Sequence, residues 1–191
     1  MLNNAILFLL HTLLDLLTLG FLLRFYFQLT KVSFNTQAAQ LIVTLTNFAV
    51  KPTRRLVPSI GRVDASTLLL AFSTQFLLEL MSFWLKDFPL FIVGSHVWLV
   101  LIGIALLSII SMSLTIFLYA VLIQAILSWV NPYTPIAPVL SSLTNPILGL
   151  FRRHIPAAGN IDLSPLVFMI AAQLVNITIL IPLENNLLAT L

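Results

Sequence analysis

The feature that most constrains this chain is a set of long apolar stretches that are nearly free of charge. Hydrophobic residues make up 60% of the 191 residues and charged residues only 8%, whereas ordinary globular chains carry about 25% charge. We therefore expect lipid to surround most of the chain, which excludes a soluble enzyme, a secreted domain and a disordered tail. The chain has no cysteine, so disulfides, thiolate metal sites and iron–sulfur clusters are excluded as well.

Four stretches are long enough to cross a bilayer, which takes about 20 apolar residues. They cover about residues 5–28, 65–85 and 163–183, together with a third stretch in chain order that ends near Trp129. The first stretch lacks basic residues at its start and is too long for a cleavable signal, so we expect it to remain as an anchor.

The third stretch is ambiguous, because apolar character runs through residues 88–130 and a straight helix of that length would reach about 60 Å. Either residues 88–103 form an interfacial, re-entrant or steeply tilted piece before one crossing, or the stretch crosses twice. Basic residues favour one crossing, since Lys and Arg concentrate in cytoplasmic loops. Four spans place eight of the nine cations on one side, namely Arg24, Lys31, Lys51, Arg54, Arg55, Arg62, Arg152 and Arg153. We predict four spans, with both termini periplasmic and both basic loops cytoplasmic.

The chain contains an internal repeat at an offset of 98 residues. Eight identical residues recur within a window of 21 positions, where residue frequencies of about 5 to 7% would give one or two. They are Thr46-Asn47, Arg54-Arg55, Pro58, Gly61, Asp64 and Ser66, which recur as Thr144-Asn145, Arg152-Arg153, Pro156, Gly159, Asp162 and Ser164. Residues 1–87 and 88–191 are therefore predicted to be two units of span, loop and span. Because two crossings return the chain to the side it left, the two helical hairpins should be parallel.

Each loop is predicted to hold an amphipathic helix. In the first loop Phe34, Ala38, Leu41, Leu45 and Phe48 follow helical spacing. The copy places Ile136, Leu140, Leu143 and Ile147 on one face. At about 14 residues neither helix can span, so each should lie in the membrane plane with its apolar face among the lipid tails. The predicted fold is thus an all-α membrane protein of two parallel hairpins, each with an in-plane helix in its cytoplasmic loop.

The repeated motif can be interpreted as a basic turn that re-enters the membrane. Pro58 and Pro156 end any helix that carries the arginines, and Gly61 and Gly159 permit the positive φ of a tight reversal. Either Asp64 or Ser66, and either Asp162 or Ser164, can cap the returning span, and Pro165 suits its first turn. The alternative is a specific site for a phosphate-bearing lipid or a partner protein, in which Arg54, Arg55, Arg152 and Arg153 contact anionic headgroups.

Several polar side chains fall inside the predicted spans, where they are costly and are functional candidates. His11 and Asp15 lie one turn apart on the first span, as Gln75 and Glu79 do on the second, and Gln173 lies on the last. If these faces converge, His11 can pair with Glu79, and Asp15 with Gln75 or Gln173. The third span adds Ser108, Ser111 and Thr115. Three interpretations are open: interhelical hydrogen bonds of about 0.6 to 2 kcal/mol each, a proton or cation pathway in an oligomer, or exposure at a thinned outer surface.

Other chemistry is absent from the sequence. His11, His96 and His154 lack metal-ligand spacing, and there is no phosphate loop, dinucleotide fingerprint or nucleophile elbow. We therefore expect no catalytic residue, no metal and no cofactor. The cations adjoin spans in short loops without interleaved aromatic residues, which favours anionic lipid over nucleic acid as their partner.

The doubled motif, together with Ser128-Trp129-Val130 at the end of the third span, resembles the YggT family of small bacterial membrane proteins over nearly the full length. The departures are small: Phe48 stands where the second copy has Pro146, and Leu56 aligns with His154. The resemblance implies an inner-membrane protein that is not a known enzyme and is linked to osmotic-stress tolerance and potassium homeostasis. Plastid relatives are linked to cytochrome haem maturation and nucleoid distribution.

Three functional hypotheses follow from the residues and the resemblance. The first is a non-enzymatic inner-membrane protein that supports membrane and ion homeostasis through lipid or protein partners. The second is an oligomeric ion channel or transporter subunit that uses Asp15 and Glu79. The third, which rests only on the plastid relatives, is an assembly factor for a membrane cytochrome complex.

Overall fold

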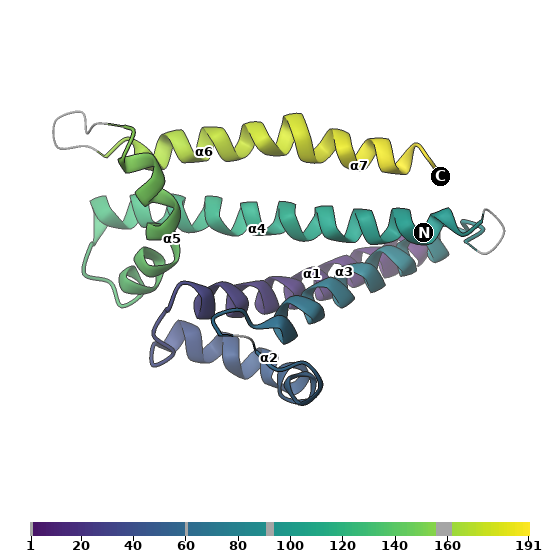
Figure 1. The fold of residues 1–191 in the computed structure, drawn as a ribbon, viewed down its shortest axis with the longest axis horizontal. Helices are drawn as coiled ribbons and strands as arrows, with labels where there is room; N and C mark the ends of the chain where they lie inside the picture. Colours follow the sequence, from purple (N-terminus) through teal and green to yellow (C-terminus); the bar gives the residue numbers. More distant parts are fainter. Residues whose placement is uncertain (1, 60, 91–93, 156–161) are drawn as a thin grey trace.

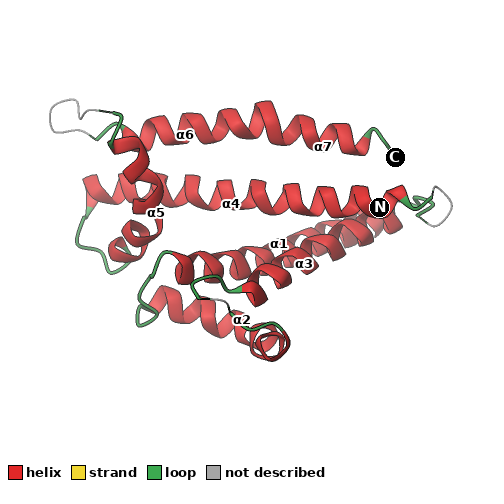
Figure 2. Ribbon diagram, viewed as in Figure 1, coloured by secondary structure: helices red, strands yellow, loops and turns green. Residues whose placement is uncertain are grey.

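The computed structural model describes residues 2–59, 61–90, 94–155 and 162–191, and in these residues the secondary structure is helical without strands (Figures 1 and 2). The helices are α1 (Leu2–Leu29), α2 (Gln37–Leu56), α3 (Ala65–Leu85), α4 (His96–Val130), α5 (Ala137–Arg152), α6 (Ser164–Val175), the π-helical turn η1 (Asn176–Leu180) and α7 (Ile181–Leu188). The last three are continuous. The all-α prediction is therefore confirmed.

Within the described residues, four helices are long and apolar enough to cross a membrane: α1, α3, α4 and the continuous helix Ser164–Leu188. This agrees with the prediction of four spans. The ambiguous third stretch forms one unbroken helix of 35 residues from His96 onward, so residues 96–103 are its first two turns and not a separate re-entrant piece. At about 52 Å, α4 is longer than the hydrocarbon layer of about 30 Å and must either tilt or project from it.

The long helices form two hairpins with the same orientation. α1 packs along α3, and α4 packs along α6. Figure 1 shows both chain termini at one end of the molecule, with α2 and α5 at the other end. A hydrogen bond from Asn3 Nδ2 to the backbone oxygen of Leu85 (3.3 Å) ties the start of α1 to the end of α3. The prediction of two parallel hairpins is confirmed.

The two connecting helices differ from the prediction in length, since α2 has 20 residues and α5 has 16. The prediction of about 14 residues was too short for α2, because its buried face continues from Ala39 through Thr46 to Val50. At its start, Thr36 accepts a hydrogen bond from the backbone nitrogen of Ala39 (3.4 Å). At its end, α2 carries Arg54 and Arg55 in its last turn, before Pro58.

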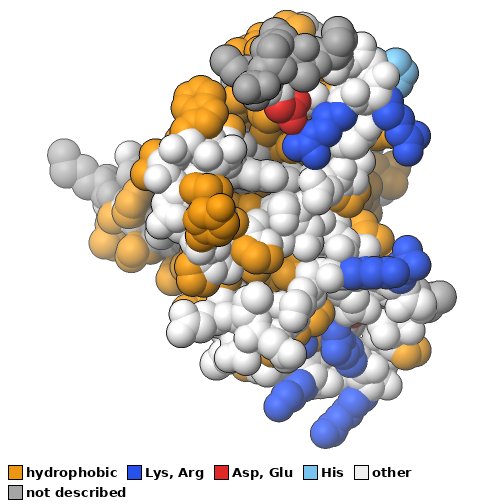
Figure 3. All heavy atoms as spheres, turned by 90° about the vertical axis from the view of Figure 1, so that its left-hand side faces the viewer, with side chains coloured by type: hydrophobic (Ala, Val, Ile, Leu, Met, Phe, Trp, Pro, Cys, Tyr) orange, Lys and Arg blue, Asp and Glu red, His pale blue; other side chains and the backbone are white. Residues whose placement is uncertain are grey.

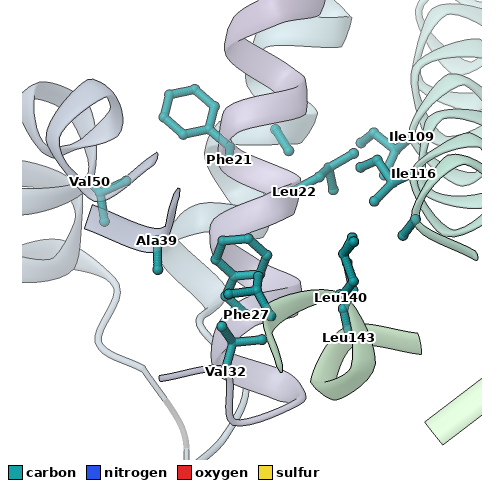
Figure 4. Packing of buried hydrophobic residues seen from close by; sticks show 13 residues of the cluster. Phe21, Leu22, Phe27, Val32, Ala39, Val50, Ile109, Ile116, Leu140 and Leu143 are labelled. Carbon is teal, nitrogen blue, oxygen red and sulfur yellow. The ribbon is translucent and has the colours of Figure 1, made fainter. Parts of the chain in front are cut away.

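One hydrophobic cluster joins the two hairpins (Figure 4). It brings together buried side chains of α1, α2, α4 and α5, including Phe21, Leu22, Phe27, Val50, Ile109, Ile116, Leu140 and Leu143. α2 approaches α1 closely at Gly20, where an added Cβ would stand 3.2 Å from Thr46 Cγ2. This close approach places the middle of α2 directly against the last two turns of α1, where Arg24 lies.

Candidate functional site

Both repeats fold the first arginine of the motif back onto the aspartate that follows it. Arg54 Nη2 donates to Asp64 Oδ2, and Arg152 Nε donates to Asp162 Oδ2 at 2.8 Å. The first pair joins the end of α2 to the start of α3, and the second joins the end of α5 to the start of α6. The two copies of the motif therefore form equivalent ion pairs.

The two ion pairs differ in how deeply they are buried. The Asp64 side chain is fully buried, whereas that of Asp162 is 41% exposed. Asp64 also accepts a hydrogen bond from Ser66 Oγ (2.5 Å), and Asp162 accepts one from the backbone nitrogen of Ser164 (2.9 Å). Burial opposes the charged form of Asp64, but the hydrogen bonds from Arg54 and Ser66 hold its pKa below the ordinary value.

The capping role expected of the motif takes a different form in each copy. Asp64 occupies the N-cap position of α3, but its side chain makes no capping bond and is engaged by Arg54 and Ser66. The N-cap of α6 is Leu163, with Pro165 in the first turn. Gly61 has a φ of +61°, which suits the reversal that follows Pro58. Pro156 and Gly159 lie outside the described residues.

The second arginine of each motif faces outward. Arg55 and Arg153 are exposed, and neither forms an ion pair with a described carboxylate. Figure 3 views the end of the molecule that carries α2 and α5, and shows Lys and Arg side chains gathered along one side of it, with hydrophobic side chains along the other. The exposed cations at this end include Lys51 and Arg62. The end is therefore basic and partly apolar.

A further residue of this region, Arg24, was not singled out as a site from the sequence. Its side chain is almost fully buried at 5% exposure, and its Nη1 donates to Thr46 Oγ1 (2.8 Å), Asn47 Oδ1 (3.0 Å) and the backbone oxygen of Val43 (3.4 Å). The sequence feature that could have identified Arg24 is an arginine inside an otherwise apolar span, at the position that Gln124 holds in the second repeat. There, Thr144 Oγ1 donates to Gln124 Oε1.

The polar side chains of α1 and α3 form an interhelical network. Gln75 Nε2 donates to Asp15 Oδ1 (2.9 Å) and to Thr18 Oγ1 (3.3 Å), and Thr18 Oγ1 lies 2.7 Å from Thr74 Oγ1. The Asp15–Gln75 contact was one of the two pairings considered for Asp15. The other does not form, because Gln173 is exposed on α6 and its side chain makes no hydrogen bond with the described residues.

His11 lies beside Asp15 and Ser82 rather than in contact with Glu79. Its Nδ1 is 3.6 Å from Asp15 Oδ2, and its Nε2 is 3.4 Å from Ser82 Oγ. Glu79 is half-buried and near enough to interact electrostatically with His11 and with Glu184 of α7. The third span does not complete this network, since Ser111 Oγ donates instead to Asn176 Oδ1 of η1 (3.4 Å).

The Asp15–Gln75 hydrogen bond is expected to couple α1 to α3. Gln75→Leu and Asp15→Ala should each destabilise the fold, and a double-mutant cycle should give a coupling energy of about 1 kcal/mol. Unfolding of the purified protein in mild detergent measures it. Ser73→Ala is the matched control on α3, since Ser73 is exposed and donates only to its own helix (2.8 Å to the Leu69 oxygen). Strictly additive effects of the two substitutions would contradict the coupling.

The described part of the chain holds no group of three or more His, Cys, Asp or Glu side chains that is able to bind a metal ion. Around Arg24, the polar groups that the structure brings together are instead arginines, amides and hydroxyls. Such groups bind anions, and carboxylates and phosphates are the anions that arginine recognises best.

Comparison with known proteins gives matches over nearly the whole chain. The model of the CCB3/YggT family matches residues 3–85 and 103–183. An uncharacterized protein of Pseudomonas aeruginosa is 34% identical over 190 residues, which cover 98% of this chain and 92% of that protein. The uncharacterized protein YggT of Escherichia coli K12 is 33% identical over 174 residues, covering 91% and 88%. An uncharacterized protein of Vibrio alginolyticus is 34% identical over 178 residues, covering 91% and 92%.

No solved structure matches the chain. The two segments that the family model matches fall one on each hairpin: the first covers α1 to α3 and the second covers most of α4 through α6. The repeat in the sequence, the repeat in the fold and the two matched segments therefore coincide.

Proposed function

Because this chain belongs to the CCB3/YggT family, we propose that it is a non-enzymatic protein of the bacterial inner membrane that binds anionic phospholipid with its two basic turns. Through this binding it supports membrane and ion homeostasis under osmotic stress. The relatives carry no assigned activity in their names, so the proposed lipid binding rests on the geometry of this chain, and the proposed role under osmotic stress rests on the family resemblance.

The observation that carries the proposal is that the two arginines of each Arg-Arg pair have different surroundings. Arg54 and Arg152 are engaged by Asp64 and Asp162, which leaves Arg55 and Arg153 exposed at the same end of the molecule. A cation near an anionic membrane surface contributes about 1 kcal/mol of attraction. Two exposed arginines at the ends of α2 and α5 thus favour a bilayer surface that is rich in anionic lipid.

The orientation belongs to the same proposal. The basic end would face the cytoplasm, since Lys and Arg concentrate in cytoplasmic loops and the cytoplasmic leaflet carries the negative surface potential. The amphipathic helices α2 and α5 would then lie at the headgroup level, with their exposed apolar side chains among the lipid tails. Leu41, Leu45 and Phe48 are exposed apolar side chains of α2 and fit this position.

Ion conduction is supported less well. The polar groups considered for a pathway are mostly engaged in bonds between α1 and α3, and Gln173 lies apart from them on α6. Interhelical hydrogen bonds of this kind hold spans together. We therefore assign the α1–α3 network to the stability of the first hairpin.

The proposal is tested with the double variant Arg55→Gln/Arg153→Gln. Loss of two surface cations should remove about 2 kcal/mol of attraction to anionic lipid, which lowers phosphatidylglycerol retention about thirtyfold. The measurement is mass spectrometry of the lipids that co-purify with the protein, alongside growth of a complemented deletion strain after an osmotic upshift.

Two controls accompany the double variant. Arg55→Lys/Arg153→Lys keeps both charges and should retain the lipid. Lys86→Gln removes an exposed cation from the connector after α3, at the other end of the hairpin, and should have no effect on lipid retention. If the double glutamine variant retains phosphatidylglycerol and tolerates stress as the unaltered protein does, the basic turns do not carry the function.

A further inference from the structure

We propose that a cavity between α1 and α2, lined by the side chains of Arg24 and Arg54, binds a phosphate-bearing anion. The second repeat is proposed to have no such site. This inference deepens the proposed lipid binding, and it rests on that proposal only where the phosphate belongs to a lipid headgroup. It concerns different side chains, however, because neither Arg55 nor Arg153 lines the cavity.

The cavity has a volume of about 420 Å³, within the range of small-molecule sites, and its walls are partly polar and partly apolar. Its lining residues are Arg24, Gln28, Phe34, Gln40, Val43, Thr44 and Arg54. Two guanidinium groups, two amides and a hydroxyl thus surround one space. Among the residues that the structure describes, no carboxylate belongs to this lining.

The charges around the cavity do not balance within the described residues. Arg24 and Arg54 carry two positive charges, and Asp64, which neutralises one of them, is bonded to Arg54. The recorded hydrogen bonds of the Arg24 guanidinium all come from Nη1 and all end on neutral oxygens. Nε and Nη2 therefore have no partner among the described residues. The Arg24 side chain is largely buried and has no direct counter-ion among the described residues, which is unfavourable, and an anion in the cavity would reduce that cost.

The second repeat has the corresponding cavity without the charge. It has a volume of about 580 Å³, lies between α4 and α5, and contains no Lys or Arg in its lining. At offsets of 98 to 100 residues, Gln124 stands for Arg24, Ser128 for Gln28, and Ser141 for Val43. The fold therefore contains this cavity in both repeats, but only the first copy has arginines in its lining.

A phosphate group fits the donors of the first cavity better than a halide does. The Arg24 guanidinium can present its Nε and Nη2 N–H groups as a pair to phosphate oxygens. Arg54 can add a single donor from Nε or Nη1, because its Nη2 already bonds Asp64 and Gln28, and the amides of Gln28 and Gln40 add further donors. Phe34 is 39% exposed and supplies an apolar surface beside the cavity. The phosphate can belong to a phospholipid headgroup or to a soluble ion, and the experiment separates the two.

The test is a calorimetric titration of the purified full-length protein in neutral detergent at about 0.15 M salt, where exposed charges are screened. One titrant is dihexanoylphosphatidylglycerol and the other is sodium phosphate. Arg24→Gln should weaken the binding of the titrant at least about tenfold, because charge-assisted hydrogen bonds are lost. Gln124 shows that the fold tolerates glutamine at this position, next to a threonine.

Thr44→Asp is a second variant that does not disturb the buried arginine. Thr44 is exposed and lines the cavity, so a carboxylate there should repel the anion and give a similar loss. Lys51→Gln is the matched control, since it removes an exposed cation of α2 outside the cavity, and should change the affinity by less than about twofold.

The outcomes are distinct. Lipid binding at least about tenfold tighter than phosphate, and dependent on Arg24, supports a headgroup site; equal, Arg24-dependent affinities support a site for a soluble phosphate anion. If neither titrant binds, or if folded Arg24→Gln and Thr44→Asp bind as the unaltered protein does, the anion site is wrong. The Arg55→Gln/Arg153→Gln variant should bind the titrant with unchanged affinity while it loses co-purified lipid. Failure of one proposal therefore leaves the other in place.

Discussion

Asp64→Asn is expected to lower the free energy of unfolding by about 3 kcal/mol, because it leaves Arg54 and Arg24 together without a counter-ion in a partly buried place. The Asp64 side chain is fully buried and receives hydrogen bonds from both Arg54 and Ser66. Asparagine keeps the shape of the side chain but not its charge. Thermal or denaturant unfolding of the purified protein in mild detergent measures the loss.

Asp162→Asn is the matched control, since it removes the same charge from the equivalent position of the second repeat. The Asp162 side chain is 41% exposed and its partner Arg152 is 44% exposed. An exposed ion pair of this kind contributes less than about 1 kcal/mol. Equal destabilisation by the two substitutions would show that burial does not distinguish the two turns.

The Arg54–Asp64 pair also predicts how stability depends on pH. Burial raises the pKa of Asp64, but the hydrogen bonds from Arg54 and Ser66 outweigh it, so the folded pKa lies below the ordinary value, which is about 3.9 for aspartate. The folded state then binds fewer protons than the unfolded state. The stabilisation is fully present above about pH 4 and is lost as the pH falls through the folded pKa. The difference in stability between the unaltered protein and Asp64→Asn should therefore shrink below about pH 4.

Reporter fusions are expected to give an all-or-none signal for the side of the membrane on which each fused position lies. Reporter fusions after Leu191 and at the Lys86–Asp87 connector should both report the periplasm, and fusions at Arg62 and at Arg153 should both report the cytoplasm. The physical reason is that the exposed cations of both hairpins, apart from Lys86, lie at the end opposite the termini, and such cations resist translocation. Paired periplasmic and cytoplasmic reporters at each position provide the measurement.

Each reporter position serves as a control for another. Parallel hairpins require Arg62 and Arg153 to agree with each other and to disagree with Leu191. A cytoplasmic signal at Leu191 together with a periplasmic signal at the connector would overturn the parallel arrangement. A complete inversion of all four signals would keep the fold but reverse the proposed side of the basic turns.

The third span shows a property that the residue pattern left open, namely the number of times that this stretch crosses the membrane. Its apolar character, from residue 88 to residue 130, indicated a helix but allowed either one or two crossings. The structure has one helix from His96, against which α3 packs on one side and α6 on the other. Hydropathy measures the preference of a segment for lipid, and it does not say how neighbouring helices hold that segment.

The polar network shows the same limit. The pairing of Asp15 with Gln75 was one of the two that the sequence allowed for Asp15, and it is the one that forms. The alternative with Gln173 does not form, because that side chain is exposed on α6. Depth along a helix can be counted from residue numbers, whereas rotation about the helix axis depends on which side chains pack between the hairpins.

The sequence by itself determined the number of spans, the parallel hairpins and the doubled basic turn. Bilayer thickness sets the length of a span, the positions of Lys and Arg favoured one crossing for the third stretch, and the parity of crossings follows from chain order. Only the tertiary structure decided that Asp64 is buried while Asp162 is exposed, and that Arg24 meets Thr46 and Asn47. The two turns share the same motif residues, so their different burial comes from packing against the rest of the fold. Contacts of this kind join side chains that are distant in sequence, and no local pattern specifies them.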